Sequence, residues 1–280
     1  MPTSHPGALP VTNIRPPSGW VPLDLREILG AHELLYFLVL RNLKLRYKQT
    51  ALGAAWALLQ PLLTMAVFTL VFGRLARLGS DGLPYAVFAL AALVPWTYFA
   101  NAITQAGNSL VDQQHLLTKV YFPRLLLPLA AVIAGLLDLA IAFVLLLAVM
   151  GWFGIEPSAR LLAAPVFGLL AAAAAFAPGV WLAALNVRYR DVRYVIPFLV
   201  QIWLFVTPVA YSSSLVPDRW RPLYELNPMA GVVAGFRWMV GPAVPFPGVG
   251  LAYSTAAVAI LLTAGLYFFR RVERSFADVV

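Results

Sequence analysis

The sequence predicts an all-α integral membrane protein. Six transmembrane helices are expected, preceded by an amphipathic interfacial helix, with a short re-entrant or interfacial helix in the last outer loop. Composition is the first observation: 61% of the 280 residues are hydrophobic, 11% are charged and the mean hydropathy is +0.80, outside the range of soluble domains. The second is six apolar runs bounded by charge, each near the 20 or so residues that cross about 30 Å of hydrocarbon. The third is an uneven distribution of Lys and Arg among the loops.

The N-terminal part of the chain precedes the first apolar run. Residues 1–22 are rich in Pro, Gly, Ser and Thr and have no apolar segment of signal-peptide length, so they are predicted to be a disordered cytoplasmic tail. Residues 23–50 are predicted to form the interfacial helix, because apolar residues recur at helical spacing, with acids early and bases late: Leu25, Ile28, Leu29, Leu34, Leu35, Leu38 and Val39. Two roles stay open for it, an anchor on anionic lipid and a docking surface for a cytoplasmic partner.

The transmembrane domain, residues 51–270, is predicted to hold all six spans, followed by a cytoplasmic C-terminal tail, residues 271–280. The third span is long enough to tilt and the fifth is short. The predicted spans are Leu52–Phe72, Tyr85–Ala106, Leu125–Met150, Leu161–Leu185, Val195–Tyr211 and Leu251–Phe269.

Basic residues predict the orientation. With the N-terminus inside, the inner segments hold six, two, three and three Lys and Arg residues, fourteen together, and the outer loops hold the other six of the 20. Cytoplasmic loops carry such an excess. Both termini are therefore expected in the cytoplasm. A nucleic-acid partner is excluded, because the basic residues interrupt apolar runs and form no face.

Prolines and one acid interrupt the predicted spans. Pro61, Pro95, Pro197 and Pro208 each remove a helical hydrogen bond and predict a bend. Asp138 is the only acid deep in a span. A hydrogen bond between helices is favoured for it over an ion or proton site, because no second intramembrane acid, Lys or His accompanies it. No metal site is predicted, since the chain has no Cys and only three scattered His.

The last outer loop contains a short helix signal between Asn227 and Gly241. Asn227 suits the N-cap and Pro228 the first helical position, while Gly241 and Pro242 end the pattern. A helix this short cannot cross the bilayer, so it is predicted to be re-entrant or interfacial on the outer side, where a gate would be built. The candidate outer-gate residues are Asn227, Pro228, Phe236 and Trp238.

Five motifs in one order carry a family resemblance. They are Arg46–Trp56 (RYKQTALGAAW) with Leu59–Leu62 (LQPL), Thr118–Arg124 (TKVYFPR), Asn186–Val192 (NVRYRDV), Thr207–Tyr211 (TPVAY) and Asn227–Met229 (NPM). Together they make the chain, from about Leu25 to Tyr267, resemble the permease subunits of bacterial ATP-binding-cassette exporters of polysaccharide, the class that handles O-antigen, capsule and teichoic acid.

The resemblance implies a transport subunit and no enzyme. Two copies of the chain would form a channel in the bacterial inner membrane for an undecaprenyl-linked polysaccharide. Two copies of a separate ATPase, which would hold ATP and Mg²⁺, would drive it, and the chain itself would bind no cofactor. Consistent with this, no Lys follows a Gly in the sequence, so the chain lacks a P-loop.

The resemblance also implies roles for particular residues. A coupling helix that seats in the ATPase would span Asn108–Phe122, with Val111, His115, Leu116 and Lys119 on one face. Basic residues near the cytoplasmic mouth would attract the substrate's pyrophosphate and give it access: Arg41, Lys44, Arg46, Lys48, Arg188 and Arg190. For Arg188 and Arg190, the alternative to attracting the pyrophosphate is to form ion pairs across a dimer. Aromatic rings that line the channel would offer a sliding surface to sugars: Trp56, Phe68, Trp203 and Phe205. Packing or lipid contact is the alternative for each ring.

Rival functions remain open on the sequence. An exporter of the same architecture could carry a drug or a lipid. A membrane-embedded transferase acting on lipid-linked sugars would need clustered acids or histidines, whereas His5, His32 and His115 are far apart in the chain. An ion-coupled transporter is disfavoured by the lack of paired titratable groups within the spans.

Overall fold

The structure is a computed structural model that describes residues 29–48, 53–119 and 122–273. The side chains of residues 53–57, 117 and 118 lie outside that description. In the described part every regular element is helical, and it contains no strand. The predicted N-terminal tail, residues 1–22, lies outside the described residues, as do residues 274–280 of the predicted C-terminal tail.

Five helices are long and apolar enough to cross a membrane. The first is α3 (Gly53–Phe68) continued by the π-helix η1 (Thr69–Leu75). The fourth is α7 (Ala164–Arg188), which the 3₁₀ turn η2 (Ala159–Ala163) precedes. The other three are α4 (Tyr85–Asp112), α6 (Leu126–Trp152) and α11 (Gly248–Glu273). The all-α membrane fold class is therefore confirmed, and these helices coincide with five of the six predicted spans.

The fifth predicted span is shorter than expected. Helix α8 runs over Val192–Val206, 15 residues, or about 22 Å at 1.5 Å per residue. The prediction that this span reaches Tyr211 is wrong. Thr207 is extended, with φ −93° and ψ 143°, because the residue before a proline is pushed out of the helical region, and Pro208 therefore ends the helix that it was expected to bend.

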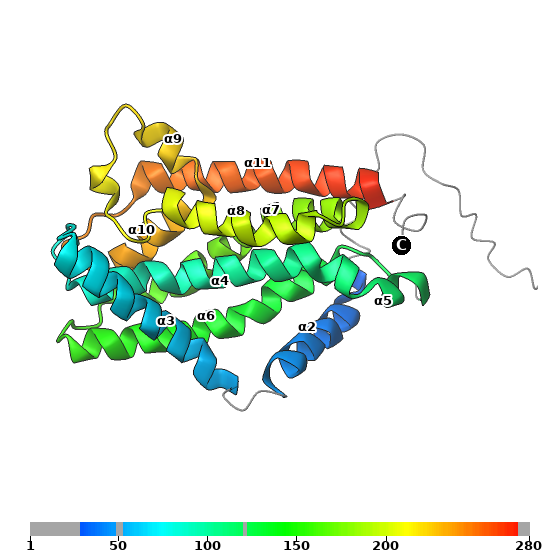
Figure 1. The fold of residues 1–280 in the computed structure, drawn as a ribbon, viewed down its shortest axis with the longest axis horizontal. Helices are drawn as coiled ribbons and strands as arrows, with labels where there is room; N and C mark the ends of the chain where they lie inside the picture. The colour runs from blue at the N-terminus through cyan, green and yellow to red at the C-terminus, as the bar shows by residue number, and fades with distance from the viewer. Residues whose placement is uncertain (1–28, 49–52, 120–121, 274–280) are drawn as a thin grey trace, which may run out of the picture.

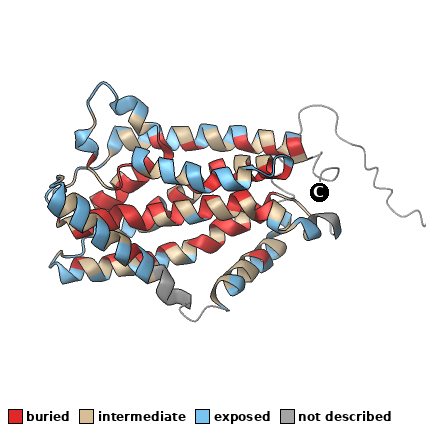
Figure 2. Cartoon of the chain, viewed as in Figure 1, coloured by how far each residue is buried: buried red, intermediate tan, exposed pale blue. Residues whose placement is uncertain are grey.

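Helix α4 is the centre of the bundle. Of its most apolar stretch 83% is buried, against 6% for the α3–η1 helix, and Figure 2 shows this contrast along the two helices. Helices α6 and α7 pack along α4. Small residues such as Ala91, Ala102 and Ala106 are fully or almost fully buried on it, which lets the backbones approach closely.

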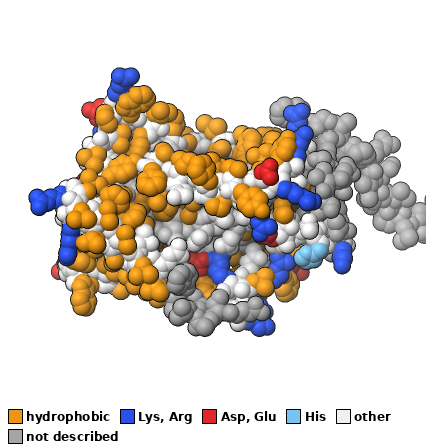
Figure 3. All heavy atoms as spheres, in the orientation of Figure 1, with side chains coloured by type: hydrophobic (Ala, Val, Ile, Leu, Met, Phe, Trp, Pro, Cys, Tyr) orange, Lys and Arg blue, Asp and Glu red, His pale blue; other side chains and the backbone are white. Residues whose placement is uncertain are grey.

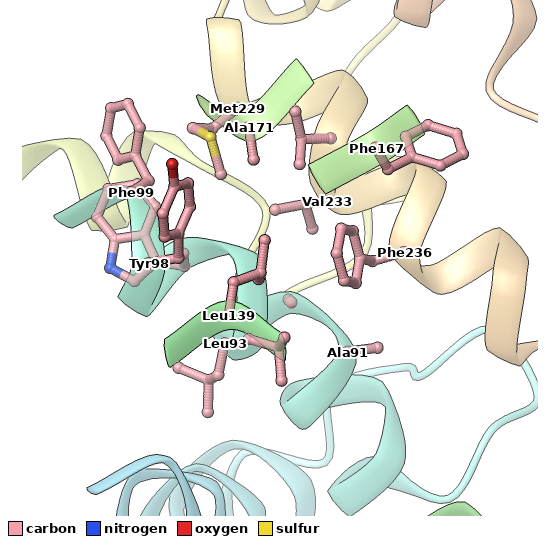
Figure 4. Packing of buried hydrophobic residues seen from close by; sticks show 14 of the residues in the cluster. Ala91, Leu93, Tyr98, Phe99, Leu139, Phe167, Ala171, Met229, Val233 and Phe236 are labelled. Atoms are coloured by element: carbon pink, nitrogen blue, oxygen red, sulfur yellow. The ribbon is translucent and has the colours of Figure 1, made fainter. Parts of the chain in front are cut away.

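The short helix of the last outer loop is confirmed. Helix α10 covers Pro228–Val240, with Asn227 as N-cap and Gly241 as C-cap. It inserts among α4, α7 and α11. Its side chains Val233 and Phe236 belong to the same buried cluster as Phe167 of α7 and Leu139 of α6 (Figure 4).

Within the segment predicted as the interfacial helix, the structure has helix α2 (His32–Tyr47), which lies along α6. Leu38 is buried and Leu34 and Leu35 pack beside it in a cluster with α4, α6, α7 and α11. The opposite face exposes Tyr36 and Phe37 together with charged residues. Apolar side chains on both faces suit a helix that lies between protein and lipid. The part of the predicted 23–50 helix before residue 29 lies outside the described residues.

The two ends of the bundle carry different elements (Figure 1). One end gathers α2, the short helix α5 (Gln114–Lys119) and the C-terminal end of α11. The other end gathers η1, α10 and the short helix α9 (Arg221–Glu225). By the predicted orientation, the first is the cytoplasmic end and the second is the outer end.

Candidate functional site

The predicted coupling segment is divided between two helices. Helix α4 continues through Asp112, so the expected start of a separate helix at Asn108 is wrong. No proline or glycine interrupts residues 108–112, and the chain turns only at Gln113 before α5. Val111 therefore belongs to α4. On α5, His115 and Lys119 are exposed and Leu116 is partly buried.

A cavity of about 590 Å³ opens beside this segment, among α2, α4 and α6. Helix α2 contributes Arg41, Asn42, Leu45 and Arg46. Helix α4 contributes Gln105, Ser109 and Asp112. Gln113, His115 and Ala131 complete the wall. All but two of these side chains are polar or charged, which makes the cavity chemically different from the apolar bundle around it.

Arg46 is tied to the acid deep in the third span. Its guanidinium donates to Asp138 of α6 and to the side-chain oxygen of Gln105 of α4. Tyr47 donates its hydroxyl to the other carboxylate oxygen of Asp138. The hydrogen bond between helices expected for Asp138 is confirmed. The bond is charge-assisted, because a guanidinium donates it to a carboxylate. From the sequence, this arginine is predicted to serve substrate access.

The remaining predicted substrate-access residues are scattered over the cytoplasmic end. Arg41 points into the cavity and is partly buried, and burial lowers its pKa and that of Arg46. Lys44 and Lys48 are exposed. Arg188 and Arg190 are exposed at the end of α7, where the Arg188 guanidinium lies 5.5 Å from the centre of the Tyr189 ring. The structure thus brings only Arg41 and Arg46 together.

The predicted channel-lining rings fall on α3 and α8, which flank one side of α4. Phe205 is 68% exposed. Trp203 is partly buried, 5.0 Å from Phe99 in an edge-to-face contact. Phe68 packs partly buried against Phe72. The side chain of Trp56 lies outside the described part.

Both flanking helices expose an apolar stripe at helical spacing. The stripes consist of Leu59, Leu63, Val67, Leu70 and Val71 on α3 and η1, and Val195, Phe198, Leu199, Ile202, Phe205 and Val206 on α8. Hydrophobic side chains cover this side of the molecule between two charged ends (Figure 3).

Asn227 joins α10 to the outer end of α8. Its side-chain oxygen accepts from the Met229 backbone N–H and from the Trp203 indole, both at 3.0 Å. Its amide nitrogen donates to Thr207 Oγ1 at 3.0 Å and to the Val206 carbonyl at 3.3 Å. Among the predicted outer-gate residues, Pro228 and Phe236 are buried and Trp238 is partly buried. They lie within the packed part of the bundle.

Two arginines secure the same outer end. Arg237, only 4% exposed, donates to the carbonyls of Val209 and Tyr211 and lies 3.5 Å from the centre of the Phe88 ring. Arg160 donates to the Gly241 carbonyl at 3.0 Å, at the C-terminus of α10, where backbone acceptors lack helical partners. These contacts fix α10 and the segment after α8 to the rest of the bundle.

A family comparison decides the class of the chain. The sequence model described as "ABC-2 type transporter" matches residues 33–241. The chain belongs to this family.

Named relatives cover nearly its whole length. The O-antigen export system permease protein RfbA of Myxococcus xanthus is 30% identical over 259 residues, which is 91% of this chain and 98% of that protein. A protein of the same name from Klebsiella pneumoniae is 24% identical over 250 residues, 89% and 95% of the two chains. The polysialic acid transport protein KpsM of Escherichia coli is 23% identical over 243 residues, 85% and 93% of the two chains.

Several contacts of this ABC-2 type chain were not predicted from its sequence. The partnership of Arg46 with Asp138 joins residues 92 positions apart, and no local pattern signals it. Arg237 is one of the six Lys and Arg residues that the sequence places in outer loops, although it is one of the most buried charged residues described. Its position inside an apolar helix, Val232–Val240, was the available signal.

Proposed function

We propose that this chain is the channel-forming subunit of an ATP-driven exporter that moves an undecaprenyl-linked polysaccharide across the bacterial inner membrane. One observation carries the proposal. The similarity to a protein named O-antigen export permease extends over 91% of this chain and 98% of that protein. Likeness over the full length of both chains favours the same architecture with the same class of cargo.

We propose that two copies of the chain form the channel. The apolar stripes of α3 and α8 support this, because exposed apolar stripes need either lipid or a partner. A channel between copies would place Phe205, the most exposed of the described predicted ring residues, at the interface. The first and fifth spans would then separate when the channel opens.

The energy would come from a separate ATPase at the cytoplasmic end. The exposed helix α5, with His115 and Lys119 on its surface, would be the contact that transmits closure of the ATPase to α4. ATP and Mg²⁺ would stay on that partner, since this sequence has no Gly-Lys pair from which a P-loop is built. Both termini would be cytoplasmic, as the excess of Lys and Arg at that end indicates.

The test is deletion of the chain in its host, with complementation as control. Lipid extraction of the cytoplasmic face and surface staining would locate the glycan. The proposal predicts polymer that is made, remains undecaprenyl-linked and accumulates inside. Normal surface glycan would refute it and favour a drug or lipid exporter of the same architecture. Loss of polymer everywhere would instead indicate a transferase.

A further inference from the structure

The cavity among α2, α4 and α6 is lined mostly by residues with polar or charged side chains, in an otherwise apolar protein. Its volume, about 590 Å³, lies in the range of small-ligand sites. It opens at the cytoplasmic end, next to the interfacial helix, where lipid headgroups lie. A ligand with a charged head and an apolar tail could therefore place its head there without leaving the membrane.

The acids of the region are already paired. Asp138 accepts from Arg46 and Tyr47. Asp112, in the cavity wall, lies 3.6 Å from Arg193 of α8. Each carboxylate thus has its own arginine, and neither is directed to Arg41.

Arg41 is the arginine of the cavity wall that neither carboxylate compensates. Its Nε is buried and has no hydrogen-bond partner among the described residues, and no ion pair is formed by Arg41 in the described part of the chain. The side chain lines the cavity. Because the Arg41 side chain has no acceptor within the described residues, an anion in the cavity would supply one to its guanidinium. Asn42 and Gln113 add amide groups to the same wall.

We propose that this cavity binds a phosphate group carried by a lipid, that Arg41 is its principal cation, and that Asp138 limits its affinity by holding Arg46. A guanidinium donates two parallel hydrogen bonds to phosphate oxygens. The inference rests on the proposed function, because it identifies the phosphate of a lipid-linked glycan as the group recognised at the cytoplasmic end.

Asp138 has a defined effect in this arrangement. Arg46 lines the same cavity as Arg41, but its charge is compensated by Asp138 at the back of the site. Without that carboxylate, Arg46 would be a second cation for the phosphate, and the ligand would be held more tightly. A transported lipid must be released again, so its binding site should have moderate affinity. Asp138 keeps the affinity moderate by pairing with Arg46.

The experiment measures binding to the purified full-length chain in phosphatidylcholine nanodiscs. Farnesyl diphosphate is the probe, with farnesol and inorganic pyrophosphate as comparisons. Arg41→Gln should weaken farnesyl diphosphate binding about tenfold or more, the effect of losing a charged hydrogen-bond partner. Arg271→Gln removes an exposed cation from the C-terminal end of α11; it is the matched control and should change the dissociation constant less than about twofold.

Asp138→Asn should tighten binding severalfold. If this variant does not assemble, the double variant Arg46→Gln with Asp138→Asn tests the same point: it removes the ion pair as a unit and should change binding less than about twofold, because the pair adds no net charge to the site. Equal effects of Arg41→Gln and Arg271→Gln, or weaker binding after Asp138→Asn, would overturn the inference.

The comparison ligands identify the source of the phosphate. Binding of farnesyl diphosphate well above pyrophosphate supports a lipid headgroup. Equal binding of both would replace the lipid with free phosphate and overturn that part of the inference. Failure here is distinguishable from failure of the proposed function: a chain that binds no phosphate but whose deletion traps glycan inside refutes only the site.

Discussion

Asn227→Ala is the substitution whose cost the structure defines best. Asn227 is 8% exposed and its side chain makes four hydrogen bonds. Alanine removes the N-cap of α10, worth about 0.5–2 kcal/mol. It also leaves the Trp203 indole N–H without its acceptor, and a buried donor without a partner costs about 1–3 kcal/mol. Because such effects overlap, we expect a loss of about 2–4 kcal/mol in the free energy of unfolding.

The assay is reversible unfolding of the purified chain by SDS in mixed micelles, followed by circular dichroism. Asn101→Ala is the matched control, because Asn101 is exposed on α4 and its side chain forms no hydrogen bond within the described part. The control should change stability by less than about 0.5 kcal/mol. If Asn227→Ala changed it no more than the control, the view that Asn227 fastens α10 to α8 would be refuted.

Three further substitutions test the packing and the proposed mechanism. Gly235→Ala should destabilise the fold by about 1–3 kcal/mol through overpacking, because an added methyl group would overlap the buried Phe167 ring. Gly151→Ala is the control, because a methyl group there meets open space. Equal melting temperatures of the two variants would contradict this packing. Lys119→Glu, on the exposed surface of α5, should abolish glycan export while membrane insertion is spared, and undiminished export would refute the coupling role. Phe205→Ala should slow export without loss of ATPase assembly, so unchanged flux would leave the ring as packing.

Hydrophobicity and local signals predicted most of the fold. Five spans appear where apolar runs of sufficient length occur, because every backbone group in lipid must be satisfied within a helix. Helix α10 was predicted from Asn227, Pro228 and Gly241, since helix ends are encoded by local capping chemistry. The end of α8 could also have been predicted, because Pro208 restricts Thr207 to an extended conformation.

The candidate site was less predictable, because it depends on distant contacts. Asp138 and Arg46 were both noticed in the sequence, but their pairing requires α2 to lie along α6, and no local rule determines that packing. The cavity needs three helices to be in place at once. From the sequence, Arg41 and Arg46 are equivalent. In the structure Arg46 is paired with Asp138, whereas Arg41 has no partner among the described residues.

ATP-driven export of a lipid-linked glycan through this chain can be measured in proteoliposomes. They would contain the purified chain with its ATPase and an undecaprenyl-linked glycan in the outer leaflet, with ATP supplied outside. Export predicts that the glycan becomes protected from an externally added glycosidase, only with ATP and only with the chain present. ATP hydrolysis without any gain in protection would contradict it.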